Sequence, residues 1–437
     1  MLSVHQHWNP LKTCVVGRCY PPEYFNYIEN LKVRGVFHRI AEETEEDYQK
    51  LISVLDKFDV NVIRTDITDN PDDYRRSDGS MKSPPMIPRD YIAMIGDKFF
   101  MPGENFGKNI DFEEELKGIL NASSLQAKHM SDVHKDILQF IYDLTIPGRP
   151  VSPATQVMLL KNLRGKNNRS VKEILSQIDI EDLKNIIFQG STNTIGKTSK
   201  YTHDDKTYPF RTLEKFVKEN GNDIIYDQYI NTASMTRLGK DLIFGIGNIM
   251  NKLNEENFQK KWKKLFPDYN VKLISVPGHS DGSFCPVKPG LIISTKTADY
   301  YADTFPGWEV VTLVDQGNPA MKPWIKNKKK NAPRYWVPEA GEAFYDYVNE
   351  WMDDWVTYVE ETIFDLNMLV IDEKNVIVNN HNDLAFDAFE RHGVTPHIVN
   401  FRHRYFWDGG LHCITSDIDR EGEQQDFKEI MKVNFPK

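Results

Sequence analysis

Short strand patterns alternate with helix patterns along most of this chain, and this alternation constrains its fold more than any other feature. Residues 11–17 form a β-branched and apolar run that ends at a glycine, which predicts a buried strand. Residues 43–58 repeat apolar side chains at intervals of three and four, which predicts an amphipathic helix before a strand at residues 60–63. This order is typical of an α/β fold. Further strands are predicted at residues 91–96, 242–244, 271–276, 369–371 and 376–378.

The stretch 109–208 interrupts this alternation. It is rich in Lys, Asn, Asp and Gln, and it shows helical periodicity with little strand pattern. Ser170 and Glu173 stand three positions apart before an apolar pair, as in a capping box that opens a helix. We therefore expect an inserted, mainly helical segment here.

A second irregular stretch covers residues 319–358. It contains a lysine-rich run at 326–330 and an aromatic helix around residues 345–355. The lysine run fits a solvated loop better than a site for a polyanion, and the aromatic stripe fits packing better than a cofactor site. Both stretches are expected as insertions in a single domain of residues 1–437.

The charge balance and the cysteine count exclude several classes of protein. The 437 residues carry 54 Lys and Arg against 64 Asp and Glu, a formal net charge of −10 at pH 7. That balance argues against a general affinity for nucleic acids, whose phosphates require a surplus of basic groups. Apolar stretches such as 242–249 are far shorter than the ~20 residues of a membrane helix, and the sequence starts without an apolar leader segment. Four cysteines cannot form a disulfide framework here. We expect a soluble, cytoplasmic protein.

A histidine and an aspartate stand two residues apart in the segment 277–284, which reads PGHSDGSF and directly follows a predicted strand. In an extended backbone, His279 and Asp281 would point to the same face. A histidine shuttles protons near neutral pH, and a neighbouring carboxylate can hold a cation. The pair alone is a weak signal, because a histidine at a strand end is often satisfied by local hydrogen bonds.

Paired glycines precede a cysteine in the segment 407–417, which reads WDGGLHCITSD. The glycines allow a backbone to approach a ligand closely. Cys413 needs a partner that favours the thiolate, because a free thiol is mostly protonated at pH 7. His412 is adjacent, but in a strand it would point to the opposite face, so His279 is the better candidate base. Without such a partner, Cys413 would be a small buried hydrophobe.

A third group of polar residues, Arg89 and Asp90, leads into the strand predicted at 91–96. A carboxylate at the mouth of a strand suits ligand binding, although Asp90 would be equally at home as a turn residue.

In this order, the segments resemble those of the amidinotransferases, typified by arginine:glycine amidinotransferase and the inosamine-phosphate amidinotransferases. The resemblance covers most of the chain apart from the two irregular stretches, and several ordered motifs are more specific than any one. Residues 8–18 resemble the family's opening strand, 86–90 (MIPRD) its MPRD segment, 279–284 (HSDGSF) its HxDATF segment, 366–378 (LNMLVIDEKNVIV) the stretch into its last module, and 409–413 (GGLHC) its nucleophile motif.

The resemblance implies both a fold and a mechanism. The fold is a five-module α/β propeller, in which ββαβ repeats surround a pseudo-fivefold axis with the active site at the centre. Cys413 would attack the central guanidino carbon of a donor and form a covalent amidino-cysteine. His279 would protonate the departing amine and then deprotonate the acceptor amine.

The same resemblance implies four substrate-binding residues. Asp90 and Asp281 occupy the family positions that grip the planar guanidinium cation with directed hydrogen bonds. Arg89, within the segment 86–90, and Ser416, three residues after the segment 409–413, are expected to join them.

The sequence departs from the family at two positions. Family members orient the histidine with an acidic residue, and ungapped counting puts Asn231 there; Asp227, four residues earlier, could substitute if the register shifts. An amide can orient a histidine but cannot stabilise imidazolium by charge. The arginine that binds the donor's carboxylate in the glycine-specific enzyme falls at Ala298, and Lys296 is the nearest cation.

The sequence thus predicts an amidinotransferase that moves an amidino group from arginine, or an arginine-like donor, to a primary amine such as glycine. The alternative is a hydrolase or deiminase of guanidino compounds on the same scaffold, and a third reading is a non-catalytic binding protein. Small-molecule substrates are the expected partners, and a homodimer is left open. No GxGxxG or Walker-type loop occurs, and we expect neither a cofactor nor a metal.

Overall fold

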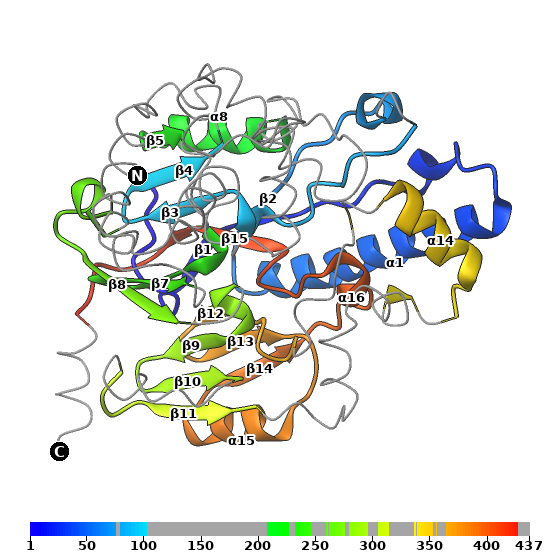
Figure 1. Ribbon diagram of the computed structural model, residues 1–437. Coiled ribbons are helices and arrows are strands. Elements are labelled where there is room, and N and C mark those ends of the chain that lie inside the picture. Colours follow the sequence, from blue (N-terminus) through cyan, green and yellow to red (C-terminus); the bar gives the residue numbers. More distant parts are fainter. Residues whose placement is uncertain are drawn as a thin grey trace, which may run out of the picture.

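The computed structural model of the protein describes residues 1–75, 79–102, 208–226, 232–246, 259–260, 262–275, 279–295, 305–313, 336–337, 339–352, 355 and 364–426 (Figure 1). The insertion predicted at 109–208 lies outside these residues apart from Tyr208, and so does the lysine run at 326–330. The predicted domain boundaries therefore stay predictions. In the described part of the chain, no helix is both long enough and apolar enough to cross a membrane.

The described strands form five three-stranded sheets with one shared pattern. In each sheet the middle strand is antiparallel to the first strand and parallel to the third. Three hairpins turn at a glycine with positive φ, namely Gly96, Gly239 and Gly290, a conformation that costs glycine little. The predicted five-module α/β fold is thereby confirmed. The sheets are β3 (Ala93–Ile95), β4 (Lys98–Met101) and β5 (Asp223–Tyr226); β6 (Met235–Leu238), β7 (Asp241–Ile246) and β8 (Asn270–Ser275); β9 (Phe284–Lys288), β10 (Leu291–Ser294) and β11 (Glu309–Thr312); β12 (Leu369–Asp372), β13 (Asn375–Val378) and β14 (Thr395–Ile398); and β15 (Thr415–Arg420), β1 (Leu11–Val16) and β2 (Asn61–Arg64).

The fifth sheet joins the two ends of the chain. Its first strand is β15, which pairs antiparallel with β1 from Leu11 opposite Arg420 to Val16 opposite Thr415. Strand β2 then pairs parallel with β1. The last described strand therefore completes the module that contains β1 and β2, and this pairing closes the ring of modules (Figure 1).

In three of the five modules, described helices lie in the crossovers that parallel pairing requires. Helix α1 (Leu31–Asp56) joins β1 to β2, α15 (Asp383–Arg391) joins β13 to β14, and α8 (Arg211–Glu219) precedes β5. The helix predicted at residues 43–58 begins twelve residues earlier than expected, at Leu31. The side chain of Asn30 caps this start by accepting the backbone N–H groups of Lys32 and Val33.

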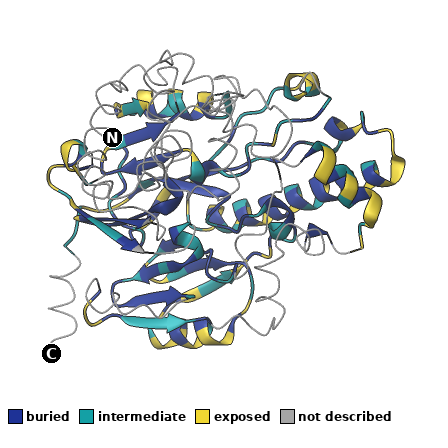
Figure 2. Ribbon diagram, in the orientation of Figure 1, coloured by how far each residue is buried: buried dark blue, intermediate teal, exposed yellow. Residues whose placement is uncertain are grey.

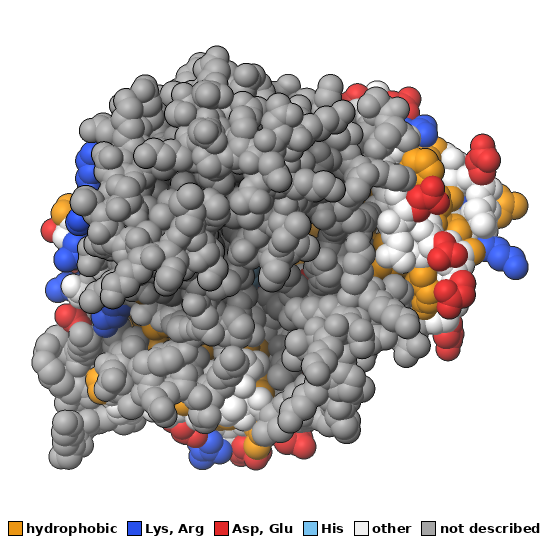
Figure 3. Space-filling view, in the orientation of Figure 1, with side chains coloured by type: hydrophobic (Ala, Val, Ile, Leu, Met, Phe, Trp, Pro, Cys, Tyr) orange, Lys and Arg blue, Asp and Glu red, His pale blue; other side chains and the backbone are white. Residues whose placement is uncertain are grey.

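The remaining expectations of local structure are largely met. The strands predicted in described residues are confirmed to within two residues at either end. The aromatic helix expected around 345–355 is α14 (Glu342–Trp351), which packs on α1 through Phe37 and Phe344, with ring centroids 5.1 Å apart. Figure 2 shows the strands buried and the outer faces of the helices exposed. Acidic side chains gather on the surface around α14 (Figure 3).

A buried ion network ties the modules together. Asp417 of β15 accepts hydrogen bonds from Arg237 of β6 and from Arg420, whose Nε lies 2.5 Å from Oδ2. Arg420 also donates to the carbonyl of Val370 at 2.8 Å, and Arg237 to that of Met94 at 2.7 Å. Burial raises the pKa of Asp417, but the two arginine charges outweigh it and hold this pKa well below its ordinary value.

Candidate active site

Each module places polar residues immediately before its first strand. The loops are tied to one another: the hydroxyl of Thr232 donates to the carbonyl of Arg89, and the hydroxyl of Ser280 donates to that of Ser234 at 2.6 Å. Equivalent ends of five modules therefore meet at one place, although the residues are far apart in sequence. These positions are Arg89 and Asp90 before β3, Thr232–Ser234 before β6, His279 and Asp281 before β9, Asn367 before β12, and Cys413 before β15.

Cys413 lies in a turn, and its side chain is almost completely buried, with 1% of the residue exposed. The backbone N–H of Ile414 donates to the carbonyl of Gly410, and β15 begins only at Thr415. The sulfur receives Nη2 of Arg89 at 2.5 Å and Nδ2 of Asn367 at 3.0 Å. The nucleophile candidate therefore faces two nitrogen donors.

The paired glycines serve the packing of this turn. A Cβ at Gly409 would meet Cβ of Cys413 at 3.2 Å, and one at Gly410 would meet Oδ1 of Asn367 at 2.7 Å. The sequence predicted that the glycines let backbone approach a ligand. Within the described residues, the groups that approach are side chains of the protein itself.

The guanidinium of Arg89 lies at the centre of the cluster, and its side chain is 5% exposed. Arg89 is in η3 (Pro88–Asp90), a single 3₁₀ turn that leads into β3. Its Nη1 lies 3.2 Å from Nδ1 of His279 and 3.3 Å from Oδ1 of Asp90, and its Nη2 lies 2.8 Å from Oδ2 of Asp281. Arg89 thus contacts the candidate nucleophile, the candidate base and both candidate guanidinium-binding carboxylates.

The two oxygens of Asp281 have different surroundings. Oδ2 receives Arg89, Nδ1 of His412 at 2.8 Å and Nδ2 of Asn367 at 3.2 Å. Oδ1 is buried and has no hydrogen-bond partner among the described residues. Burial raises the pKa of Asp281, but the charge of Arg89 and the hydrogen bond from His412 outweigh it and hold this pKa below its ordinary value. The carboxylate is therefore charged and keeps one acceptor free.

The local backbone around His279 differs from the prediction. Ser280–Gly282 form the 3₁₀ turn η7, with His279 immediately before it, so the extended-strand argument for a shared face is wrong. His279 and Asp281 nevertheless converge, because Arg89 from another module contacts both. The tertiary arrangement, not strand periodicity, brings them together.

Sequence reasoning missed two residues of the cluster. His412 was expected to point away from Cys413 because both were placed in a strand; in the observed turn, its Nδ1 binds Asp281. Asn367 received no role, although it contacts both Cys413 and Asp281. Both residues lie in quoted motifs, GGLHC and LNMLVIDE, and that was the available signal.

One predicted site residue, Ser416, is not hydrogen-bonded into this cluster, and others lie outside the described residues. The hydroxyl of Ser416, on β15, donates to the carbonyl of Ile92 at 3.4 Å and makes no hydrogen bond with the other candidate residues among those described. Asn231 and Asp227, the alternatives for orienting His279, lie outside the described residues, as do Lys296 and Ala298. The roles of these five residues stay predictions.

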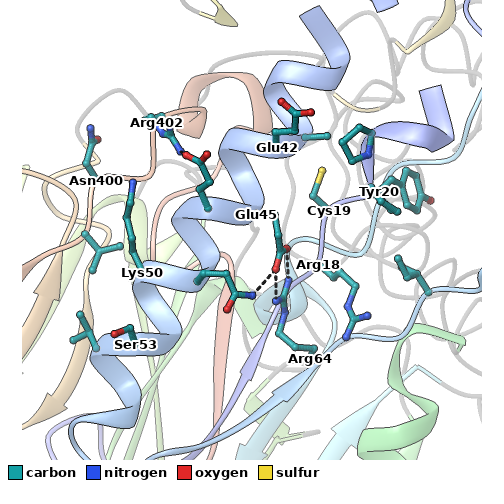
Figure 4. Close-up of a pocket in the computed structure, with 18 of the residues that line it drawn as sticks. Arg18, Cys19, Tyr20, Glu42, Glu45, Lys50, Ser53, Arg64, Asn400 and Arg402 are labelled. Atoms are coloured by element: carbon teal, nitrogen blue, oxygen red, sulfur yellow. Dashed lines mark hydrogen bonds and ion pairs between the residues drawn. The ribbon is translucent and has the colours of Figure 1, made fainter. Parts of the chain in front are cut away.

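A cavity of about 1390 Å³ lies beside α1, and none of the candidate site residues lines it (Figure 4). Its walls include Arg18, Glu45, Arg64 and Arg402. Arg64 binds both carboxylate oxygens of Glu45 at 3.0 Å, and Arg402 binds Asp47. Most of its charged groups therefore neutralise one another, and we do not assign the cavity to the active site.

Comparisons with known proteins agree with the sequence motifs, although no protein-family model matches the chain. The chain is 27% identical over 243 residues to the mitochondrial glycine amidinotransferase of Xenopus laevis, covering 51% of this chain and 47% of the relative. It is 23% identical over 230 residues to the L-arginine:L-lysine amidinotransferase of Pseudomonas savastanoi pv. phaseolicola, covering 51% and 54%. The chain thus spans about half the length of the curated relatives it matches. Among solved structures, an amidinotransferase of the saxitoxin biosynthetic pathway from Microseira wollei aligns with a TM-score of 0.49 at 13% identity, covering 98% of this chain and 99% of that one.

Over about half of its length the chain is therefore similar in sequence to amidinotransferases, as its ordered motifs predict. Its five three-stranded sheets agree with the fold that this resemblance implies.

Proposed function

We propose that this protein transfers an amidino group from arginine, or an arginine-like donor, to a primary amine through a covalent intermediate on Cys413. The observation that carries the proposal is the cluster around the buried sulfur: a guanidinium and an amide as donors, with a carboxylate oxygen 3.8 Å away. The two nitrogen donors that contact the sulfur favour the reactive thiolate.

The carboxylates supply a place for the donor's guanidinium. Asp281 keeps Oδ1 as a buried acceptor without a partner among the described residues, while its Oδ2 already binds Arg89 and His412. Asp90, with 25% of its side chain exposed, provides a second carboxylate. A guanidinium is planar, permanently charged and rich in N–H donors, so it matches paired carboxylates. We infer that the donor binds through Oδ1 of Asp281 and through Asp90.

The first half-reaction forms the covalent intermediate. The thiolate of Cys413 attacks the central guanidino carbon, the bond from that carbon to the donor's chain nitrogen breaks, and protonated His279 gives its proton to the departing amine. The products are a neutral amine, neutral His279 and a cationic amidino group on sulfur. Ornithine is the departing amine if arginine is the donor.

The second half-reaction returns the enzyme to its starting state. An acceptor amine attacks the amidino carbon, neutral His279 takes a proton from that amine, and the carbon–sulfur bond breaks to restore the thiolate. If water were the attacking group instead, the same site would act as a hydrolase.

Mass spectrometry of the enzyme incubated with arginine alone tests the first half-reaction. We expect a mass increase of one amidino group on the peptide that contains Cys413. Cys413→Ser should lose the adduct and turnover while it remains folded. Cys285→Ser is the matched control, because Cys285 lies within strand β9 and not in a loop before a strand; this variant should keep both.

Product analysis separates transfer from hydrolysis. For a transferase, we expect more than one ornithine per enzyme molecule when an amine such as glycine is present. Without an amine, ornithine should not exceed one per enzyme molecule. Urea, citrulline or ammonia formed from arginine without an amine would replace this proposal by the hydrolase or deiminase alternative.

A further inference from the structure

Asn367 has no assigned role, yet it is fully buried and is hydrogen-bonded to the sulfur of Cys413, to the backbone of the turn that carries Cys413, and to Asp281. We propose that Asn367 is the positioning residue for Cys413, with an amide oxygen that fixes the cysteine's backbone and an amide nitrogen that holds its sulfur in the reactive state. The consequence for turnover rests on the proposed function, but the effect on the sulfur does not.

The amide oxygen of Asn367 organises the turn that carries the nucleophile. Oδ1 accepts the backbone N–H of His412 at 2.8 Å and that of Cys413 at 3.1 Å. These two consecutive N–H groups precede β15, so the strand ladder does not satisfy them. One side-chain oxygen therefore fixes both the position of Cys413 and the direction in which its side chain leaves the backbone.

The amide nitrogen of Asn367 acts on the reacting atom itself. Nδ2 lies 3.0 Å from Sγ of Cys413 and 3.2 Å from Oδ2 of Asp281. An amide does not titrate, so it remains a donor at every pH at which the enzyme works. A hydrogen bond donated to the charged form of a group favours that form, and here it favours the thiolate.

The packing around Asn367 fixes the orientation of its amide. The backbone of Gly410 lies so close that an added Cβ would come within 2.7 to 2.9 Å of three side-chain atoms of Asn367. On the other side, Nδ2 of Asn379 donates to the backbone carbonyls of Asn367 at 3.0 Å and of Phe364 at 2.7 Å. Asn367 is thus held from both sides.

The position of Asn367 in the fold matches that of the other site residues. It stands just before β12, as Cys413 stands before β15 and Asp90 before β3. With Asn367, the module of β12, β13 and β14 contributes a side chain to the shared centre, as the other modules do. This equivalent position in the fold supports a role for Asn367 in the site separately from its hydrogen bonds.

A pH titration of the Cys413 thiolate tests the proposal. The ultraviolet absorbance of the thiolate is followed as the difference between Asn367→Ala and the same variant carrying Cys413→Ser. Burial raises the pKa of Cys14 and of Cys285 to about 12, so these thiols do not interfere near neutral pH. The same difference is measured between the wild-type enzyme and its Cys413→Ser variant. Relative to that reference, we expect the titration midpoint of the Cys413 thiolate in Asn367→Ala to rise by about one pH unit or more.

Asn222→Ala is the matched control. Asn222 is also a buried asparagine that bridges backbone groups: it accepts the N–H of Leu2 at 3.0 Å and donates to the carbonyls of Leu2 at 2.8 Å and of Asp97 at 2.9 Å. Its loss should lower stability in urea unfolding and leave the Cys413 midpoint unchanged. If Asn367→Ala also lowered stability without moving the midpoint, Asn367 would be merely structural and the proposal would be overturned.

Gly410→Ala provides a second, independent variant, because the added methyl displaces the amide of Asn367 without removing it. It should raise the midpoint in the same direction, and an unchanged midpoint in this folded variant would count against the proposal. If the enzyme is an amidinotransferase, raising the pH should restore part of the activity that Asn367→Ala loses. Absence of any amidino adduct in wild type would refute the proposed function alone, since the thiolate titration does not depend on a donor.

Discussion

Nη2 of Arg89 lies 2.5 Å from Sγ of Cys413, so a guanidinium from the module of β3 rests on the thiol that precedes β15. An arginine side chain keeps its charge at all relevant pH values, and a fixed positive charge beside a thiol favours the thiolate. Arg89 also carries the same chemical group as the proposed donor. It occupies Oδ2 of Asp281 and leaves Oδ1 for that donor.

Replacing Arg89 should slow the enzyme most at neutral pH. Without the guanidinium, the thiolate of Cys413 loses its nearest positive charge, so we expect Arg89→Met to reduce turnover at pH 7 about 10- to 100-fold. A rise in pH should recover part of this loss. The turnover of Arg89→Lys at pH 7 should lie between those of wild type and Arg89→Met. The measurement is the pH profile of amidino-adduct formation with arginine.

Arg64→Met is the control for this prediction. Arg64 is also a mostly buried arginine with an acidic partner, Glu45, but it contacts no residue of the cluster. Its pH profile should match that of wild type. An Arg89→Met enzyme with a wild-type profile would show that the guanidinium does not support the thiolate.

Asp281→Asn should weaken recognition of the donor. Hydrogen bonds to charged groups contribute about 1.5–3 kcal/mol each, so we expect a loss in kcat/KM for arginine of roughly 10- to 100-fold or more. Because Arg89 and His412 hold the pKa of Asp281 below its ordinary value, the wild-type carboxylate stays charged as the pH falls to about 4. Donor affinity that dropped between about pH 6 and 4 through protonation of this group would contradict the assignment. Asp90→Asn should show a similar loss in kcat/KM, which steady-state kinetics measures.

Asp417→Asn should destabilise the whole ring, because it leaves Arg237 and Arg420 buried without their shared counter-charge. We expect a loss of about 3–5 kcal/mol in the free energy of unfolding at pH 7. The folded pKa of Asp417 lies below its unfolded value, so its stabilising contribution is present above about pH 4 and is lost at lower pH. Urea unfolding should therefore show that the difference in the free energy of unfolding between wild type and Asp417→Asn becomes smaller below about pH 4.

Asp419→Asn, on the same strand, is the comparison for Asp417. Asp419 accepts one hydrogen bond, from the backbone N–H of Ser3 at 3.0 Å, so its replacement should cost only about 1 kcal/mol. Equal losses in the two variants would mean that the buried network adds nothing beyond a single hydrogen bond.

Asn231 and Asp227 offer two ways to orient His279, and two substitutions separate them. If Asn231 is the direct neighbour, Asn231→Asp should speed the reaction or shift the acidic limb of its pH profile, because a carboxylate stabilises imidazolium. Asp227→Asn should then be nearly silent. If Asp227 is the neighbour, Asp227→Asn should instead be severe, and rates measured across pH decide between the two.

Much of the local structure followed from the sequence because it depends on neighbours along the chain. The strand β1 was predicted from a β-branched run, and part of α1 from its three-and-four spacing. The segments that carry Cys413, His279 and Asp90 were recognised from their ordered motifs. Their residue types reflect chemical requirements, and these can be read without coordinates.

The conformation of the short site segments could not be predicted in the same way. His279 and His412 were assigned to extended backbone, but they lie beside a 3₁₀ turn and within a turn. Three or four residues carry too little periodicity to separate a turn from a strand. Backbone hydrogen bonds such as that from Ile414 to Gly410 decide the outcome.

The pairing of β1 with β15 and the contacts of Asn367 were decided only by the tertiary structure. Leu11 and Arg420 are opposite one another because closure of the ring brings the chain ends together. Asn367 reaches Cys413 because two modules place equivalent loops at one centre. Sequence patterns report which face of an element is buried, whereas contacts between modules depend on how those buried faces pack against each other. The chain by itself therefore specified the strands, the helices and the chemistry of the motifs, and packing around the ring decided which side chains meet at the sulfur.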